Sequence, residues 1–257
     1  MNFIFYILGF LPSAIWLFFY LRKDSHPESN RMILITFLFG MMAAFYALIL
    51  ELAFREVANL SSDNGAIQSF LRAILGNEFA IQYEQLIIKI MMVFIGGAMI
   101  EEVVKYLVVR LLIFQNAELD EPVDLMLYMI IGALGFAAVE NILFLLNYPQ
   151  MSEGILTPLN ALIAMGCRFV SATFLHALSS AVLGYFIALS FLNIKNKKRY
   201  FLLGLLISSI LHGIYNWYIM AERGELVIAL LVFLGLIVGL IFKKIKNVKS
   251  VCLLKND

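Results

Sequence analysis

Seven long runs of apolar residues follow one another along the chain. They cover residues 3–21, 32–54, 86–114, 123–147, 168–193, 200–220 and 225–243. A membrane-spanning helix needs about 20 predominantly apolar residues. Within lipid, a helix also satisfies its backbone hydrogen bonds inside its own segment. The sequence therefore predicts an all-α fold, a transmembrane helical bundle of about seven spans.

The composition agrees with residence in lipid. Hydrophobic residues make up 62% of the 257 residues and charged residues 14%, whereas a soluble domain has roughly 45–50% and about 25%. The net charge of +1 argues against a nucleic-acid partner. Cys167 lies in an apolar run and Cys252 in a basic tail, so they indicate neither a disulfide framework nor a metal cluster. We expect a single membrane domain over residues 1–257.

The distribution of Lys and Arg predicts the orientation of the helices. Basic residues gather in the connections 22–31 and 194–199 and in the tail 244–257, while the connection 148–160 has none. Cytoplasmic loops carry an excess of Lys and Arg, so we expect the N-terminus outside and a basic cytoplasmic tail. The stretch 55–85 is too polar for a clean span and partly amphipathic, which predicts a surface or re-entrant segment.

Ionisable residues inside the predicted spans need an explanation, because a charge at the bilayer centre costs roughly 2.5–3.5 kcal/mol on insertion scales. The span 86–114 contains Glu101, Glu102 and Lys105 near its middle. Glu101 and Lys105 share a helix face and can pair. Two adjacent carboxylates in a low dielectric do not easily both ionise, a condition that favours general acid or base catalysis. An ion pair that fixes helix packing is the alternative.

Each of the next three spans also contains polar groups. These are Glu140 with Asn141, His176 with Ser180, and His212 with Asn216. The stretch 132–135, rich in small residues, lets a neighbouring helix approach Glu140 closely. Taken singly, a histidine in a helix is more often a packing residue than a ligand. In the predicted topology, however, these groups fall at similar depth on four consecutive helices, which packing needs do not predict. The pattern indicates a site that activates water inside the membrane.

Four motifs occur in order along these spans: Glu-Glu-x-x-Lys at 101–105, Phe-x-x-x-Glu-Asn at 136–141, and histidine motifs at His176 and at His212–Asn216. This set resembles the PrsW family of intramembrane proteases over roughly residues 95–217. Asp124 and Arg168 are similar to family positions, whereas Leu125 stands where the family pattern has Gly. The resemblance implies a catalytic core at about 86–220.

The resemblance also implies a function. The family belongs to a wider group that includes the CAAX prenyl proteases, and its members are multi-pass proteins of the bacterial cytoplasmic membrane. The implied activity is hydrolysis of a peptide bond in or near the transmembrane segment of a membrane protein. The implied partners are membrane lipid and a single-pass protein substrate. The founding activity is site-1 cleavage of an anti-sigma factor in stress signalling.

One mechanism compatible with these residues uses a metal. Catalytic zinc has three protein ligands with water in the fourth position, and Glu140, His176 and His212 suit that arrangement. Glu101 or Glu102 is then the base that takes the water proton. The chain has no His-x-x-x-His pair, so the strong zincin signature is absent.

The second mechanism needs no metal. One of the adjacent glutamates, or Glu140, activates water directly, while His212 and Asn216 donate to the developing oxyanion. Lys105 holds a glutamate carboxylate in place in either mechanism. Spacing along the chain does not separate the two mechanisms. Either needs a water-filled cavity that reaches the buried base.

Two functions without hydrolysis are also compatible with intramembrane Glu, Lys and His. Such residues line proton and ion pathways in transporters, although this sequence has no inverted repeat of the transporter kind. A scaffold that binds single-pass helices without cleaving them is the other alternative. A cleavage assay separates these functions from a protease.

Overall fold

A computed structural model describes residues 3–22, 28–116, 119–152, 156–246 and 248, and every regular element in these ranges is helical. The helices in chain order are α1 (Phe3–Leu21), α2 (Asn30–Asp63), α3 (Ala66–Leu75), α4 (Asn77–Met91), the π-helix η1 (Met92–Met99), α5 (Ile100–Leu112), α6 (Pro122–Ser152), α7 (Pro158–Val170), α8 (Ala172–Leu192), the 3₁₀ turn η2 (Ile194–Asn196), α9 (Lys197–Met220) and α10 (Gly224–Lys246). The predicted all-α class is confirmed.

Six stretches of the described chain are long and apolar enough to cross a membrane. The expected span 86–114 is not among them, because it is assembled from α4, η1 and α5 and carries Glu101, Glu102 and Lys105. The prediction of about seven spans thus agrees with six apolar stretches and one further helical segment, made of α4, η1 and α5, that carries charged residues. The inside and outside assignment of the two termini stays a prediction.

The second helix is longer than expected. We predicted a span ending at residue 54, but α2 continues to Asp63. Residues 55–63 contain neither Gly nor Pro, and polar side chains do not by themselves end a helix. The helix stops before Gly65, which has φ 65°, a conformation that favours glycine. The expected surface segment 55–85 is therefore the end of α2, all of α3 and the start of α4.

The fifth expected span begins earlier than 168. The Thr157 side chain accepts a hydrogen bond from the backbone N–H of Asn160 at 3.2 Å, and Pro158 occupies the first turn of α7. Both are strong signals for a helix start. The chain then breaks at Ser171, which has φ −118° and ψ −91°, before α8 begins. The helix α7 therefore precedes the helix that carries His176, and the two together form one apolar stretch, Pro158–Leu192.

Helix α6 lies at the centre of the bundle and packs against α8, α2 and α1. Its residues 125–131 are at most 1% exposed. A helix that is apolar on every side is buried on every side, and α6 follows this rule. The outer helices expose large apolar side chains instead, such as Leu240 on α10 at 71%, as expected where lipid is the solvent.

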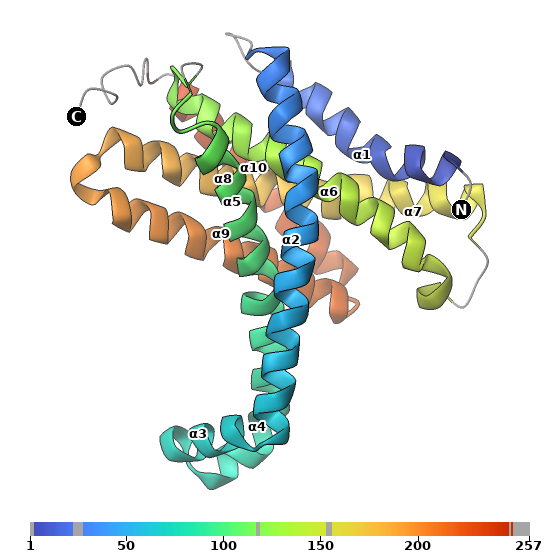
Figure 1. Ribbon diagram of the computed structural model, residues 1–257, viewed down its shortest axis with the longest axis vertical. Helices are drawn as coiled ribbons and strands as arrows, with labels where there is room; N and C mark the ends of the chain where they lie inside the picture. The colour runs from blue at the N-terminus through green and yellow to red at the C-terminus, as the bar shows by residue number, and fades with distance from the viewer. Residues whose placement is uncertain (1–2, 23–27, 117–118, 153–155, 247, 249–257) are drawn as a thin grey trace.

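Helix α2 stands across most of the other helices (Figure 1). Its lower part, together with α4 and α3, extends away from the bundle, and α3 lies at the tip. The upper part of α2 packs on α6 and α5. One end of α2 thus supports the core, while the other end projects from the bundle and contacts η1 and α3.

The contact between α2 and α6 depends on glycine. A Cβ atom on Gly135 would collide with the backbone carbonyl oxygen of Phe37, and one on Gly40 would collide with the carbonyl oxygen of Gly132. These are backbone atoms, which cannot move away as a flexible side chain can. The small-residue stretch 132–135 therefore brings α2 against the helix that carries Glu140.

Gly135→Ala is expected to destabilise the protein, because the added methyl group forces α2 and α6 apart. Overpacking of this kind costs about 1–3 kcal/mol. The measurement is the midpoint of thermal unfolding in detergent. Gly166→Ala is the matched control, since a Cβ there meets nothing within 4 Å. Equal midpoints for the two variants would contradict the prediction.

Candidate active site

Four helices bring ionisable side chains together in the interior. Glu101, Glu102 and Lys105 come from α5, Glu140 from α6, His176 from α8 and His212 from α9. All are buried except the Glu140 side chain, which is 28% exposed. The candidate residues that the sequence placed at a similar depth thus lie in one cluster.

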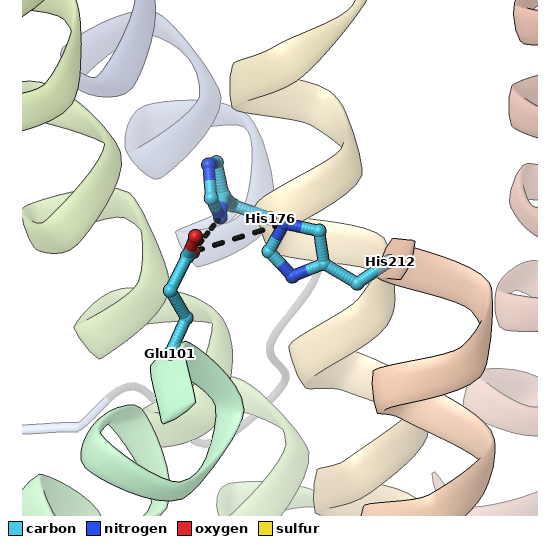
Figure 2. A group of neighbouring side chains, drawn as sticks. All are labelled: Glu101, His176 and His212. Atoms are coloured by element: carbon cyan, nitrogen blue, oxygen red, sulfur yellow. Dashed lines mark ion pairs between the residues drawn. The ribbon is translucent and has the colours of Figure 1, made fainter. Parts of the chain in front are cut away.

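Glu101 faces both histidines (Figure 2). Its Oε2 atom lies 3.7 Å from His176 Nδ1 and 3.7 Å from His212 Nε2. The two imidazole rings are 5.1 Å apart and nearly perpendicular, at 89°. One ligand atom from each of the three residues lies within 4.8 Å of the other two. This buried Glu/His/His group has the spacing of a metal-binding site.

Each histidine uses its second ring nitrogen to contact another carboxylate. His176 Nε2 lies 2.6 Å from Glu140 Oε2, and His212 Nδ1 lies 3.0 Å from Glu102 Oε1. Histidines that ligate metals almost always donate their other N–H to a carboxylate, a carbonyl or water. Both imidazoles are therefore oriented with one nitrogen toward Glu101 and the other on a supporting carboxylate.

Glu102 is the most completely bonded carboxylate of the cluster. Lys105 Nζ and Ser179 Oγ each donate to its Oε1 at 3.0 Å, and Ser180 Oγ donates to its Oε2 at 3.2 Å. Burying a charge is tolerable when it is paired and hydrogen-bonded. Glu102 is thus fixed in place, and it holds His212 in turn.

Lys105 binds several groups of the cluster at once. Besides Glu102, it lies 3.3 Å from Glu101 Oε2 and 3.0 Å from His176 Nδ1. Its ammonium also sits 4.6 Å from the centroid of the Phe136 ring. The lysine therefore supplies a positive charge between two glutamates, as the sequence predicted for the Glu-x-x-x-Lys spacing.

Glu140 is supported from α7. Arg168 lies 3.7 Å from Glu140 Oε2 and donates from Nε to Asn141 Oδ1 at 2.6 Å. The Asn141 amide in turn donates to Thr173 Oγ1 at 3.0 Å. This chain of contacts joins α6, α7 and α8 beside His176. Asn141 and Arg168 thus position Glu140 without facing Glu101.

Two residues named from the sequence lie apart from these contacts. Asn216 is half-buried one turn beyond His212 on α9 and makes no hydrogen bond to the cluster within the described chain. Asp124 lies at the start of α6, where its Oδ2 accepts backbone N–H bonds from Asp120 and Glu121. Asp124 therefore stabilises the backbone turn at the start of α6.

One neighbour of the cluster was not singled out from the sequence. Glu51 on α2 interacts electrostatically with Glu140, Lys105 and Glu101. It lies within the expected span 32–54, so an ionisable residue inside a span was the signal that could have found it. Because Glu51 lies near the end of that span, placing its charge in the membrane costs less than at the centre, and the residue did not stand out.

Glu51 lines a cavity of about 280 Å³ between α2 and η1, together with Arg55, Gly96 and Gly97. The sequence predicts that water must reach the buried base, and this cavity carries two charged side chains, Glu51 and Arg55, in a mostly apolar lining. The π-helix η1 lines it and leads directly into Glu101. Single π-helical turns inside α-helices occur frequently at functional sites.

The fold and the cluster together define a polytopic helical membrane protein with a buried acid–histidine site. The chain belongs to the PrsW family of intramembrane metalloproteases, whose family model matches residues 28–241. Protease PrsW of Geobacillus kaustophilus is 28% identical over 82% of this chain and 76% of its own length. Protease PrsW of Bacillus subtilis is 24% identical over 95% of this chain and 94% of its own. No solved structure matches.

Family membership confirms three predictions made from the sequence. The protein is a member of the PrsW family, it is an intramembrane protease, and it is a multi-pass bacterial membrane protein. The family is described as one of metalloproteases, and the buried Glu/His/His group is able to bind a metal ion.

Proposed function

We propose that this protein cleaves a peptide bond in or near the transmembrane segment of a single-pass membrane protein, using a zinc ion. The observation that carries the proposal is the buried group of Glu101, His176 and His212, with ligand atoms within 4.8 Å of one another. Two imidazoles and one carboxylate are the donor set of several catalytic zinc sites.

The surroundings of the three residues fit a metal ion. Glu101 Oε2 is buried and makes no hydrogen bond within the described chain; Lys105, at 3.3 Å, pairs with its charge, and a metal ion would satisfy the remaining lone pairs of this buried oxygen. Lys105 Nζ lies 3.0 Å from His176 Nδ1, so ligation through that nitrogen replaces this contact. Glu101 and Glu102 remain as partners for the lysine.

This ligand set differs from the one named from the sequence, which had Glu140 in place of Glu101. We propose that Glu140 orients His176 through the 2.6 Å contact to Nε2. Glu140 has the more accessible carboxylate, and its described contacts all use Oε2. We therefore assign Glu140 Oε1 as the acceptor of the proton released from the attacking water.

When bound, a zinc ion supplies Lewis acidity for the hydrolysis. The chain's own residues supply position and charge. Glu102, fixed by Lys105 and two serines, holds His212. Glu140, fixed by Arg168, holds His176. The apolar bundle around them excludes bulk water, which strengthens every charge interaction in the site.

The resemblance supports an anti-sigma factor as the substrate, cut at a first site in a stress response. A helix must unwind locally before a water molecule can attack a peptide bond inside it. A single transmembrane helix suits a site with this requirement. A cavity between α2 and η1, two helices that meet near Glu101, supports an entry route from that side.

Reconstitution in proteoliposomes with a tagged single-pass protein tests the proposal. Wild-type protein is expected to produce a cleaved fragment, and His176→Ala is expected to produce none above background, because that imidazole touches both Glu101 and Glu140. The readout is fragment size and yield on a gel, with a thermal melt to show that the variant is folded.

Cys167→Ser is the matched control for that assay, since Cys167 is exposed on α7. It is expected to cleave at the wild-type rate. Wild-type cleavage by the folded His176→Ala variant would overturn the site assignment. Ion flux in proteoliposomes with no cleavage of any substrate would favour a transporter.

A further inference from the structure

An apolar groove of about 490 Å³ runs between α1, α8 and α10. Its volume lies in the range of small-molecule sites, roughly 300–1,000 Å³. Phe174 and Leu178 of α8 line it, two residues before and two after His176. Side chains two positions apart point about 200° from one another on a helix. The groove is therefore on the face of α8 opposite the catalytic cluster.

Two glycines of α10 keep the groove open. A Cβ atom on Gly239 would meet nothing within 4 Å, and one on Gly235 would meet only the Phe174 ring, at 3.6 Å and beyond. The two glycines are one helical turn apart and both line the groove. The space along this side of α10 is thus present because glycine has no side chain to fill it.

The groove is apolar along most of its length and positively charged at one end. Lys243 and Lys246 complete its lining and are both exposed. None of the described residues that line it is acidic. From Gly235 to Lys243 the helix rises by about 12 Å, close to the hydrocarbon depth of one leaflet, about half of 30 Å. An apolar slot of one leaflet's depth therefore leads to a pair of ammonium groups.

We propose that this groove binds an anionic phospholipid, with an acyl chain between α1, α8 and α10 and the phosphate at Lys243 and Lys246. The apolar walls suit hydrocarbon, and the two lysines suit a negatively charged headgroup at the membrane surface. In the predicted topology these lysines face the cytoplasmic leaflet, where anionic lipids give the surface a negative potential.

The bound chain touches aromatic rings that brace α8. The Trp16 indole stacks on Phe174, with ring centroids 4.4 Å apart and an interplanar angle of 11°. Its Nε1 also donates to the carbonyl oxygen of Phe169 at 2.8 Å. Because Trp16 itself lines the groove, its fluorescence reports directly on an occupant.

Fluorescence quenching by brominated lipids tests the proposal on the full chain in vesicles. The chain has two tryptophans, so Trp217→Phe leaves Trp16 as the single emitter. At equal mole fraction, brominated phosphatidylglycerol is expected to quench Trp16 more strongly than brominated phosphatidylcholine. A basic residue at an anionic surface contributes roughly fivefold to the preference. Equal quenching by the two lipids would overturn the proposal.

Charge variants separate this site from general attraction to the membrane. In the Trp217→Phe background, Lys243→Gln with Lys246→Gln is expected to bring the preference close to one. Lys243→Gln alone removes one charge and is expected to lower the preference. Lys244→Gln is its matched control, because it removes one charge from an exposed neighbour that does not line the groove, and it is expected to keep the preference. An equal loss in the Lys244→Gln variant would assign the effect to surface charge alone and reject the site.

Filling the groove tests where the lipid chain lies. Gly239→Phe places a ring in the open space and is expected to reduce quenching by both lipids. Leu236→Phe is the control, since Leu236 is 66% exposed and does not line the groove. Stronger quenching after deletion of residues 249–257 would assign the groove to the chain's own terminal segment and overturn the proposal.

Discussion

Glu101→Gln is expected to abolish cleavage and zinc binding together. The substitution keeps the size of the side chain but removes the charge that faces His176 and His212 at 3.7 Å. A neutral amide is a poor ligand for zinc, so the site loses one of its three proposed donors. The measurements are cleavage of the single-pass substrate and zinc content of the purified protein by mass spectrometry.

The matched variant Glu140→Gln separates the two possible ligand sets. Glu140 is proposed to orient His176 and to accept a proton, so its loss is expected to lower the rate by about 10²–10⁴-fold, as for a general base. Zinc content is expected to stay near one equivalent. A Glu140→Gln protein without zinc, beside a Glu101→Gln protein that retains it, would restore Glu140 as the ligand.

Treatment with a strong chelator is expected to reduce cleavage by wild-type protein to background. Added Zn²⁺ is expected to restore cleavage and Mg²⁺ is not, because imidazole suits zinc whereas magnesium prefers oxygen ligands. Chelator already saturated with zinc is the control for effects on the vesicles. The measurements are initial cleavage rate and bound metal, followed through removal and return.

Full activity in the metal-depleted protein would support the metal-free mechanism instead. In that case His212 and Asn216 are the candidate oxyanion donors, and Asn216→Ala is expected to lower the rate about 10²–10³-fold. Under the zinc mechanism Asn216, which makes no hydrogen bond to the cluster in the described chain, is expected to matter little. The same variant thus gives opposite results for the two mechanisms.

The helical class and the members of the cluster could be predicted because polar groups without a hydrogen-bond partner are costly in lipid. Apolar runs of about 20 residues leave few alternatives to a helix. Glu140, His176 and His212 were conspicuous because each lies in an otherwise apolar run, where a polar group has to find a partner.

The sequence could not decide between Glu101 and Glu140 as the proposed carboxylate ligand. Spacing along a helix says which residues share a face, but it does not say which oxygen of Glu101 or Glu140 meets which nitrogen of His176. Those contacts depend on how four helices rotate against one another. The position of Glu51 beside the cluster depends on the same packing, because α2 reaches the cluster through its contacts with α5 and α6.

The geometry of this site depends on how many residues the π-helix η1 contains, as well as on which residues they are. A π-helical turn holds one more residue than an α-helical turn, since its hydrogen bonds join i and i+5. Eight residues, Met92–Met99, are wound in this way, and only Ile100 separates them from Glu101 and Glu102. The direction in which the carboxylates of α5 point therefore depends on the winding of η1. Shortening Met92–Met99 by one residue would turn both glutamates by about 100°, a change as disruptive as replacing them.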